Sequence, residues 1–217
     1  MLKRTTLPLL ILLLLSACSR QGGLDTDDAR EQQWQLQQQA AGALQQWNLY
    51  ARGSLRRQGE LYNVGIRWQR EREYRFRMFL DAPFGRGVLR IEGLGEQRFR
   101  LQLPDGRQFE NSSVEALLED VVGWSLPISG LDYWVRGLPH PGSPNRRLLN
   151  AGGQAGSIVQ DGWDITYSDY FDTAQPVLPR RLQLAGDELT LKLVIERWQR
   201  EQAPADTGDA GLFPSFD

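Results

Sequence analysis

Alternation of apolar and charged side chains between Tyr62 and Gly93 constrains this chain more than any other feature of its sequence. From residue 74 to residue 80 every second side chain is apolar, and Arg75 and Arg77 stand between the first three of them. This period of two is typical of a half-buried antiparallel strand. The alternation ends at Pro83, and Gly85 favours a turn. We therefore expect Phe84 at the tip of a loop, which is an unusual place for a bulky apolar side chain.

Similar segments on both sides of this stretch predict a mainly β domain. A helix is expected from Ala29 to Gln46, after the acidic residues 25–28, and two more at 111–122 and 128–137. Residues 138–150 contain three prolines and are expected to form a loop. Helices on the concave side of a curved sheet would act as a lid over an apolar hollow. The predicted strands cover residues 47–57, 61–70, 73–81, 88–92, 97–103, 107–110, 156–161, 162–170, 179–185 and 188–198.

The first residues carry an export signal. Lys3 and Arg4 precede an unbroken apolar run, and small residues follow it, so residues 1–17 are interpreted as a signal peptide. The segment ending at Cys18 resembles the lipobox of bacterial lipoproteins, in which the cysteine becomes the acylated first residue. An ordinary secreted protein with an unrelated cysteine is the alternative, but Cys18 is the only cysteine and stands at this boundary. An Asp directly after the cysteine would resemble the signal for inner-membrane retention in enterobacteria, and Ser19 in its place favours the outer membrane.

The domain boundaries follow from these segments. Residues 18–28 are expected to be a lipidated tether, 29–198 the folded domain and 199–217 a flexible tail. The chain of 217 residues has 25 Lys and Arg against 27 Asp and Glu, and loss of Lys3 and Arg4 changes the net charge from −2 to −4. A mildly acidic chain is a poor nucleic-acid binder. Membrane attachment is expected to depend on the lipid and on apolar contacts.

The usual catalytic constellations are missing from the sequence. It has one histidine, His140, one cysteine and no G-x-S-x-G motif. We therefore expect no catalytic residue, no metal site and no cofactor, although the scattered Asp and Glu residues leave a carboxylate pair open.

Taken in order, the motifs of the chain resemble the family of the outer-membrane lipoprotein receptor LolB. Members of that family carry Leu at the loop tip where this chain has Phe84, and Phe keeps the apolar character. The resembling residues are the lipobox ending at Cys18, Trp47, Gly53, 66–69, 82–85, 117–118, 123–127, 133–137, 160–167, 178–179 and 192–195 before Trp198.

The resemblance implies a half-open antiparallel β-barrel with a helical lid over an apolar cavity. It also implies a lipid-anchored protein on the periplasmic face of the outer membrane, expected to be monomeric. Such a receptor accepts the acyl chains of lipoproteins from the soluble periplasmic carrier LolA and inserts the lipoproteins into the outer membrane, without a cofactor. The alternative is an outer-membrane lipoprotein that transfers nothing and scaffolds other proteins or binds another apolar ligand. The lipobox argues against the soluble carrier itself, which must diffuse.

Three groups of residues are the candidate sites. Cys18 is the expected lipidation site. Pro83, Phe84 and Gly85 form the candidate membrane-transfer loop, unless Phe84 folds back onto the sheet. The candidates for the acyl-chain cavity share a large apolar body, and ordinary core packing is the alternative for each, because the sequence does not assign their faces. They are Trp68, Tyr74, Phe76, Met78, Leu101, Trp124, Trp134 and Trp163.

Overall fold

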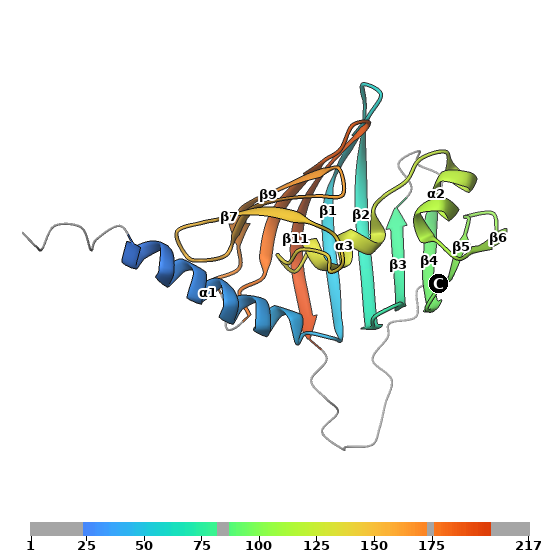
Figure 1. Ribbon diagram of the computed structural model, residues 1–217. Coiled ribbons are helices and arrows are strands. Elements are labelled where there is room, and N and C mark those ends of the chain that lie inside the picture. Colours follow the sequence, from blue (N-terminus) through green and yellow to red (C-terminus); the bar gives the residue numbers. More distant parts are fainter. Residues whose placement is uncertain (1–23, 82–86, 173–175, 201–217) are drawn as a thin grey trace, which may run out of the picture.

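One curved sheet makes up most of the structure. The computed structural model describes residues 24–81, 87–172 and 176–200. Within them, eleven antiparallel strands lie in the order β6-β5-β4-β3-β2-β1-β11-β10-β9-β8-β7, with β6 and β7 as open edges (Figure 1). This confirms the predicted half-open antiparallel barrel. The strands are β1 (Trp47–Arg57), β2 (Glu60–Arg72), β3 (Arg75–Asp81), β4 (Val88–Gly95), β5 (Arg98–Gln102), β6 (Gln108–Asn111), β7 (Asn145–Leu149), β8 (Ala155–Gln160), β9 (Trp163–Tyr170), β10 (Pro179–Ala185) and β11 (Leu189–Arg200).

The first and last strands meet in the middle of the sheet. β1 pairs with β2 on one side and with β11 on the other, along its whole length. Gly53 permits this approach, because a Cβ atom built on it would collide with the backbone carbonyl oxygen of Lys192 in β11. Every other strand pairs with its neighbour in the chain, so two meanders, β2–β6 and β7–β10, extend from this centre.

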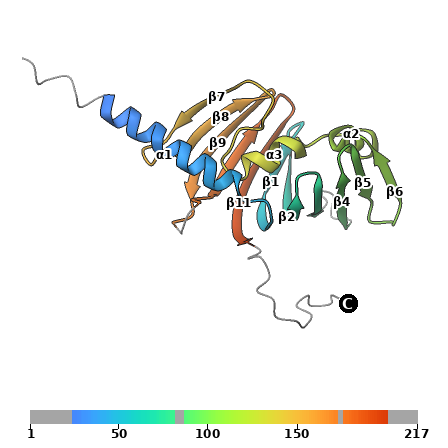
Figure 2. The same ribbon diagram turned by 60° about the horizontal axis from the view of Figure 1, so that its bottom comes forward.

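The three helices lie on one face of the sheet, which we call the inner face; the opposite face is the outer face (Figures 1 and 2). They are α1 (Leu24–Gly42), α2 (Val114–Val122) and α3 (Ile128–Trp134). α1 lies along the β7–β11 half, whereas α2 contacts β5 and β6. Ser113 caps α2, as predicted, because its hydroxyl accepts a hydrogen bond from the Ala116 N–H.

Alternation along the strands accounts for the core. In β2, Val64, Ile66 and Trp68 are buried on the inner face, and the residues between them are not. The apolar sides of α2 and α3 close over this face through Leu117, Leu118 and other buried residues. Within the described ranges, no helix has both the length and the apolar character that a membrane span needs.

Three elements differ from the prediction. The first helix is Leu24–Gly42 rather than 29–46, because acidic residues are favourable in the first turns of a helix and not only before it. The third strand begins at Arg75, since Tyr74 has a φ of 57° and belongs to the turn. Part of the predicted loop 138–150 is the edge strand β7, whose side chains are mostly exposed, so no apolar alternation marks it.

Candidate functional site

Apolar side chains form a continuous row across the inner face. Strand register aligns Trp68 with Met78, Met78 with Ile91, and Ile91 with Leu101, from β2 to β5. All four side chains are almost completely buried. The helices and this row together enclose a large apolar surface.

An aromatic cluster lies beside this row. The ring of Trp68 is 5.1 Å from that of Trp47 and 5.9 Å from that of Phe76, both edge-on, and Phe76 is 6.3 Å from Phe99. Gly93 makes room for Phe76, because a Cβ atom at this position would stand 2.7 Å from the Phe76 ring. Rings of this size bury much apolar area while freezing few rotatable bonds.

A small cavity separates part of the lid from this cluster. Its volume is about 40 Å³, enough for a few water molecules. Phe76 and Phe99 line it from the sheet, Val114 and Ile128 from the helices, and polar side chains from the β2–β3 turn and α3 surround the opening. A larger open groove of about 570 Å³ lies between the first half of α1 and residues 151–153. Among the described residues, the cavity between these helices and Phe76 and Phe99 is too small for an acyl chain.

Two buried arginines and one aspartate join the lid to the sheet at this cavity. Nε of Arg70, in β2, is 2.9 Å from a carboxylate oxygen of Asp132 in α3, and Arg136 is 3.4 Å from the other oxygen. The Arg70 guanidinium also donates to the carbonyl of Gln45 at 2.5 Å, and that of Arg136 donates to the carbonyl of Leu44 just after α1. We call Arg70, Asp132 and Arg136 the arginine clamp. It connects α1, α3 and β2.

Burial dominates the electrostatics of the arginine clamp. Burial raises the pKa of Asp132 above its ordinary value, and the positive charges of Arg136 and Arg70 oppose that rise. Burial also lowers the pKa of Arg136. The Tyr133 hydroxyl donates to Glu73 at 3.0 Å, and burial together with this hydrogen bond raises the pKa of Tyr133 to about 12. In the arginine clamp, the negative charge of Asp132 is thus shared between the positive charges of Arg70 and Arg136.

The structure brings together some of the predicted cavity residues. Trp68, Phe76, Met78 and Leu101 share the inner face of β2, β3 and β5, and Phe76 lines the cavity itself. Tyr74 lies in a turn and is 44% exposed, and it also lines the cavity.

The remaining candidates lie apart from this group. Trp134 is fully buried in α3, and its ring is 6.5 Å from that of the partly buried Trp163 in β9. Trp124 is buried between α2 and α3. Cys18 and the predicted loop of Pro83, Phe84 and Gly85 lie outside the described residues.

Sequence reasoning missed the arginine clamp. A signal was present in β2, where the inward-facing positions 64, 66 and 68 are apolar and Arg70 takes the next one. Asp132 and Arg136 have the spacing of neighbours on one helical face. A charge at an inward-facing position usually has a buried partner.

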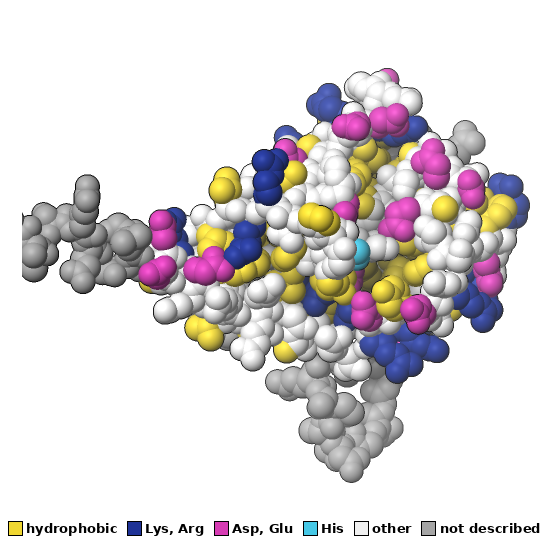
Figure 3. All heavy atoms as spheres, viewed as in Figure 1, with side chains coloured by type: hydrophobic (Ala, Val, Ile, Leu, Met, Phe, Trp, Pro, Cys, Tyr) yellow, Lys and Arg dark blue, Asp and Glu magenta, His cyan; other side chains and the backbone are white. Residues whose placement is uncertain are grey.

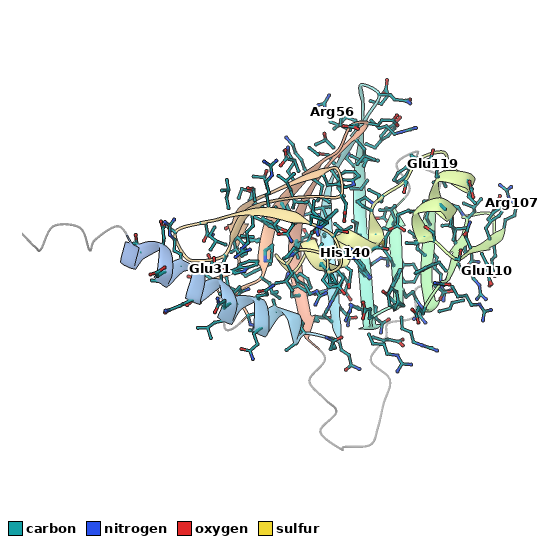
Figure 4. All side chains as sticks on the ribbon, viewed as in Figure 1. Glu31, Arg56, Arg107, Glu110, Glu119 and His140 are labelled. Carbon is teal, nitrogen blue, oxygen red and sulfur yellow. The ribbon has the colours of Figure 1, made fainter. Side chains whose placement is uncertain are left out.

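His140, the only histidine, lies beside α3 near the middle of the lid face (Figures 3 and 4). Its backbone N–H donates to the side chain of Gln160 at 2.8 Å, and its ring is 5.2 Å from that of Tyr133. In the described ranges, no group of three His, Cys, Asp or Glu residues is arranged to hold a metal ion.

Fold and site together define a half-open antiparallel barrel in which helices cover an aromatic inner face. The family model for "Outer membrane lipoprotein LolB" matches residues 45–198. The chain therefore belongs to the LolB family.

Individual relatives agree with this assignment. The outer-membrane lipoprotein LolB of Pseudomonas aeruginosa is 36% identical over 197 residues, which cover 88% of this chain and 93% of the relative. That of Pseudomonas fluorescens is 33% identical over 187 residues, with 85% and 90% covered. The crystal structure of a DUF1329 family protein from Desulfovibrio piger has a TM-score of 0.50 at 6% identity and covers 83% of this chain and 95% of its own. At that identity the likeness concerns the fold alone.

Proposed function

We propose that this chain accepts the acyl chains of lipoproteins from the periplasmic carrier LolA and inserts the lipoproteins into the outer membrane. In this proposal Cys18 carries the lipid that anchors the chain to that membrane. Membership of the LolB family supports both points. The observation that carries the proposal is the aromatic inner face, covered by α2 and α3, of which the arginine clamp joins α3 to the sheet.

Acyl chains would enter by separating the lid from the sheet. The cavity of about 40 Å³ between these helices and the sheet cannot hold them, so we expect α2 and α3 to move away from Phe76 and Phe99. Each CH₂ group withdrawn from water contributes about 0.8 kcal/mol. The lid gives up its own apolar contacts with the sheet when the acyl chain enters. The net affinity is therefore the free energy gained by burying the acyl chain minus the free energy lost by opening the lid. A small net affinity favours release of the acyl chain. A free-energy difference of about 1.4 kcal/mol between this chain and the membrane gives a tenfold preference for the membrane.

The interior also offers polar anchors for the head of the cargo. The buried Nε1 atoms of Trp47 and Trp68 have no hydrogen-bond acceptor within the described ranges. An acyl ester or amide carbonyl would accept from them once the lid opens. Outward movement of α3 from β2 would separate Asp132 from Arg70, so the arginine clamp sets part of the cost of opening.

In this proposal, Phe84 contacts the bilayer when the lipoprotein is inserted into the outer membrane. Burying its ring in the bilayer contributes about 1.5–3 kcal/mol. This is too little to anchor the protein, a role that falls to the lipid on Cys18, but enough to turn the open side of the barrel toward the membrane.

A reconstituted transfer assay tests the proposal. LolA loaded with a lipoprotein is mixed with liposomes that carry this chain, and both loss from the carrier and incorporation into the bilayer are measured. Phe84→Glu should still unload the carrier but stall at incorporation, whereas the matched Phe84→Leu should do both. A chain that never unloads the carrier would instead be a static outer-membrane lipoprotein, and normal incorporation by Phe84→Glu would refute the role of the ring.

A further inference from the structure

The outer face carries a row of alternating arginine and aromatic side chains that the proposed transfer does not use. Register places Arg197 of β11 beside Tyr50 of β1, and Tyr50 beside Arg67 of β2. It continues with Phe79 of β3 beside Arg67, and Arg90 of β4 beside Phe79. We call these five residues the arginine–aromatic row. It crosses five neighbouring strands.

Ring stacking orders the guanidinium groups of this row. The guanidinium carbon of Arg197 lies 4.2 Å from the centre of the Tyr50 ring. Those of Arg67 and Arg90 lie 5.2 Å and 5.8 Å from the centre of the Phe79 ring, one on each neighbouring strand. Such cation–π contacts hold an arginine against a ring while its N–H groups remain able to bind an anion.

Positive charge in the row is only partly neutralised. Among the described residues, neither Arg67 nor Arg197 forms an ion pair. Arg90 contacts the carboxylate of Glu92 at 2.7 Å, but this carboxylate also faces Arg77 at 3.4 Å and Arg100 at 3.8 Å. One carboxylate thus serves three guanidinium groups, although the chain as a whole has a net charge of −2.

Three other acidic groups of this face are engaged elsewhere or lie in another row. Glu110 pairs with Arg100, and Glu196 pairs with Arg52. Asp81 lies in the neighbouring row, next to Gly65. Acidic side chains are instead prominent on the lid side, over α2 and the start of α1 (Figure 3). The chain therefore has an uneven distribution of charge that its total does not reveal.

We propose that the arginine–aromatic row binds the phosphate groups of anionic phospholipids in the bilayer. Guanidinium forks bind phosphate oxygens in pairs, so the row matches that ligand in charge and in geometry. The inference rests on the proposed function, because that function holds the chain at a membrane with residues 82–86 toward it.

Strand geometry places the row at the right depth. Phe79 precedes Asp81, the last described residue before 82–86, by two positions, which is about 7 Å along a strand. The polar layer on each side of a bilayer is roughly 5–8 Å thick. When the end of β3 meets the hydrocarbon boundary, Phe79 and its cross-strand neighbours Arg67 and Arg90 stand at headgroup depth, and long arginine side chains reach the phosphates. β1 and β2 continue past this level to Arg57 and Glu60, so the sheet has to meet the bilayer at a tilt that brings the β3–β4 side down first.

Vesicle binding tests the row. The exported chain with Cys18→Ala, which removes the lipid anchor, is mixed with vesicles of phosphatidylethanolamine alone or with phosphatidylglycerol added. We expect stronger partitioning into the anionic vesicles. Arg67→Gln with Arg90→Gln should reduce it about fivefold for each guanidinium removed, since one basic residue near an anionic surface contributes about 1 kcal/mol. Binding to the neutral vesicles should not change.

The matched control removes the same charge from the other half of the sheet. Arg146→Gln with Arg181→Gln should reduce binding less than about twofold, because charges beyond a Debye length of the surface are screened. Equal losses in both pairs, or no preference of the parent chain for anionic vesicles, would overturn the proposal. The assay contains neither carrier nor lipoprotein, so its failure leaves the transfer proposal intact, and a failure of transfer leaves this result standing.

Discussion

At Asp132, one buried carboxylate faces the guanidinium groups of Arg70 and Arg136. Asp132→Asn removes the negative charge and leaves two guanidinium groups buried without a counterion. We expect the free energy of unfolding to fall by about 3–5 kcal/mol, the usual cost of removing one partner of a buried pair. Urea denaturation followed by tryptophan fluorescence measures the change.

A surface pair provides the control for this substitution. Asp105 contacts Arg107 at 2.7 Å with both side chains exposed, so Asp105→Asn should leave the urea midpoint almost unchanged. Similar small effects of the two substitutions would mean that the arginine clamp does not hold the lid closed.

Tyr133 makes stability depend on alkaline pH. Its pKa is raised to about 12 from the ordinary value of 10, mainly by burial. The unfolded chain therefore loses this proton first as the pH rises. The contribution is complete below pH 10 and is lost as the pH rises from 10 toward about 12.

Urea midpoints measured across this range check the effect. Tyr133→Phe should make the decline with pH shallower, and Tyr167 and Tyr170, whose pKa values burial also raises, should account for the decline that remains. Curves of the same slope for both proteins would contradict the role of Tyr133.

The face on which a side chain lies could be predicted where apolar and polar residues alternate. Contacts between residues far apart in the chain could not be predicted, because the tertiary fold decides them. A period of two predicts that Phe76 and Met78 share one face of their strand, and the structure shows that this is the inner face. Tyr74 also fits that period, but the left-handed backbone of a tight turn takes it out of the strand. The partner of Arg70 is 62 residues away in the chain, so no local pattern could identify it.

Among the elements, β1 is paired along its whole length on both edges, with β2 and with β11. Gly53→Ala would press a methyl group against the backbone of β11, and backbone cannot move aside as a flexible side chain can. We expect a loss of about 1–3 kcal/mol in the free energy of unfolding. Thermal denaturation followed by circular dichroism measures it.

Gly42, at the end of α1, is the matched control for this substitution. No atom lies within 4 Å of a Cβ built there, so Gly42→Ala should be neutral or should stabilise the chain by up to about 1 kcal/mol. Equal effects at the two glycines would show that β1 and β11 are not so tightly paired.

Strand positions could be predicted for the interior of the sheet but not for its margin. β1 and β10 coincide with the predicted ranges, since both alternate and end at turn residues. β7 shows no alternation, because an edge strand with exposed side chains needs none. The helix at 24–42 was misplaced because its weakly amphipathic, glutamine-rich sequence marks neither end.

In the whole molecule, the described cavity between the lid and the aromatic face has room for water but not for lipid. The molecule has to open to act as proposed, and its two faces then have different tasks. The inner face receives acyl chains, while the arginine–aromatic row faces phospholipid headgroups. The sequence alone could not separate these tasks, because apolar and basic side chains alternate along the same strands.

Photo-cross-linking measures directly where the acyl chain lies. A photoreactive phenylalanine analogue replaces either Phe76, which lines the inner cavity, or Phe79, on the outer face of the same strand. The exported chain with Cys18→Ala is loaded by LolA with a radiolabelled lipoprotein in the absence of vesicles and then irradiated. We predict that position 76 becomes attached to the labelled acyl chain and that position 79 does not. Equal labelling, or labelling at 79 alone, would contradict the claim that acyl chains enter between the lid and the inner face.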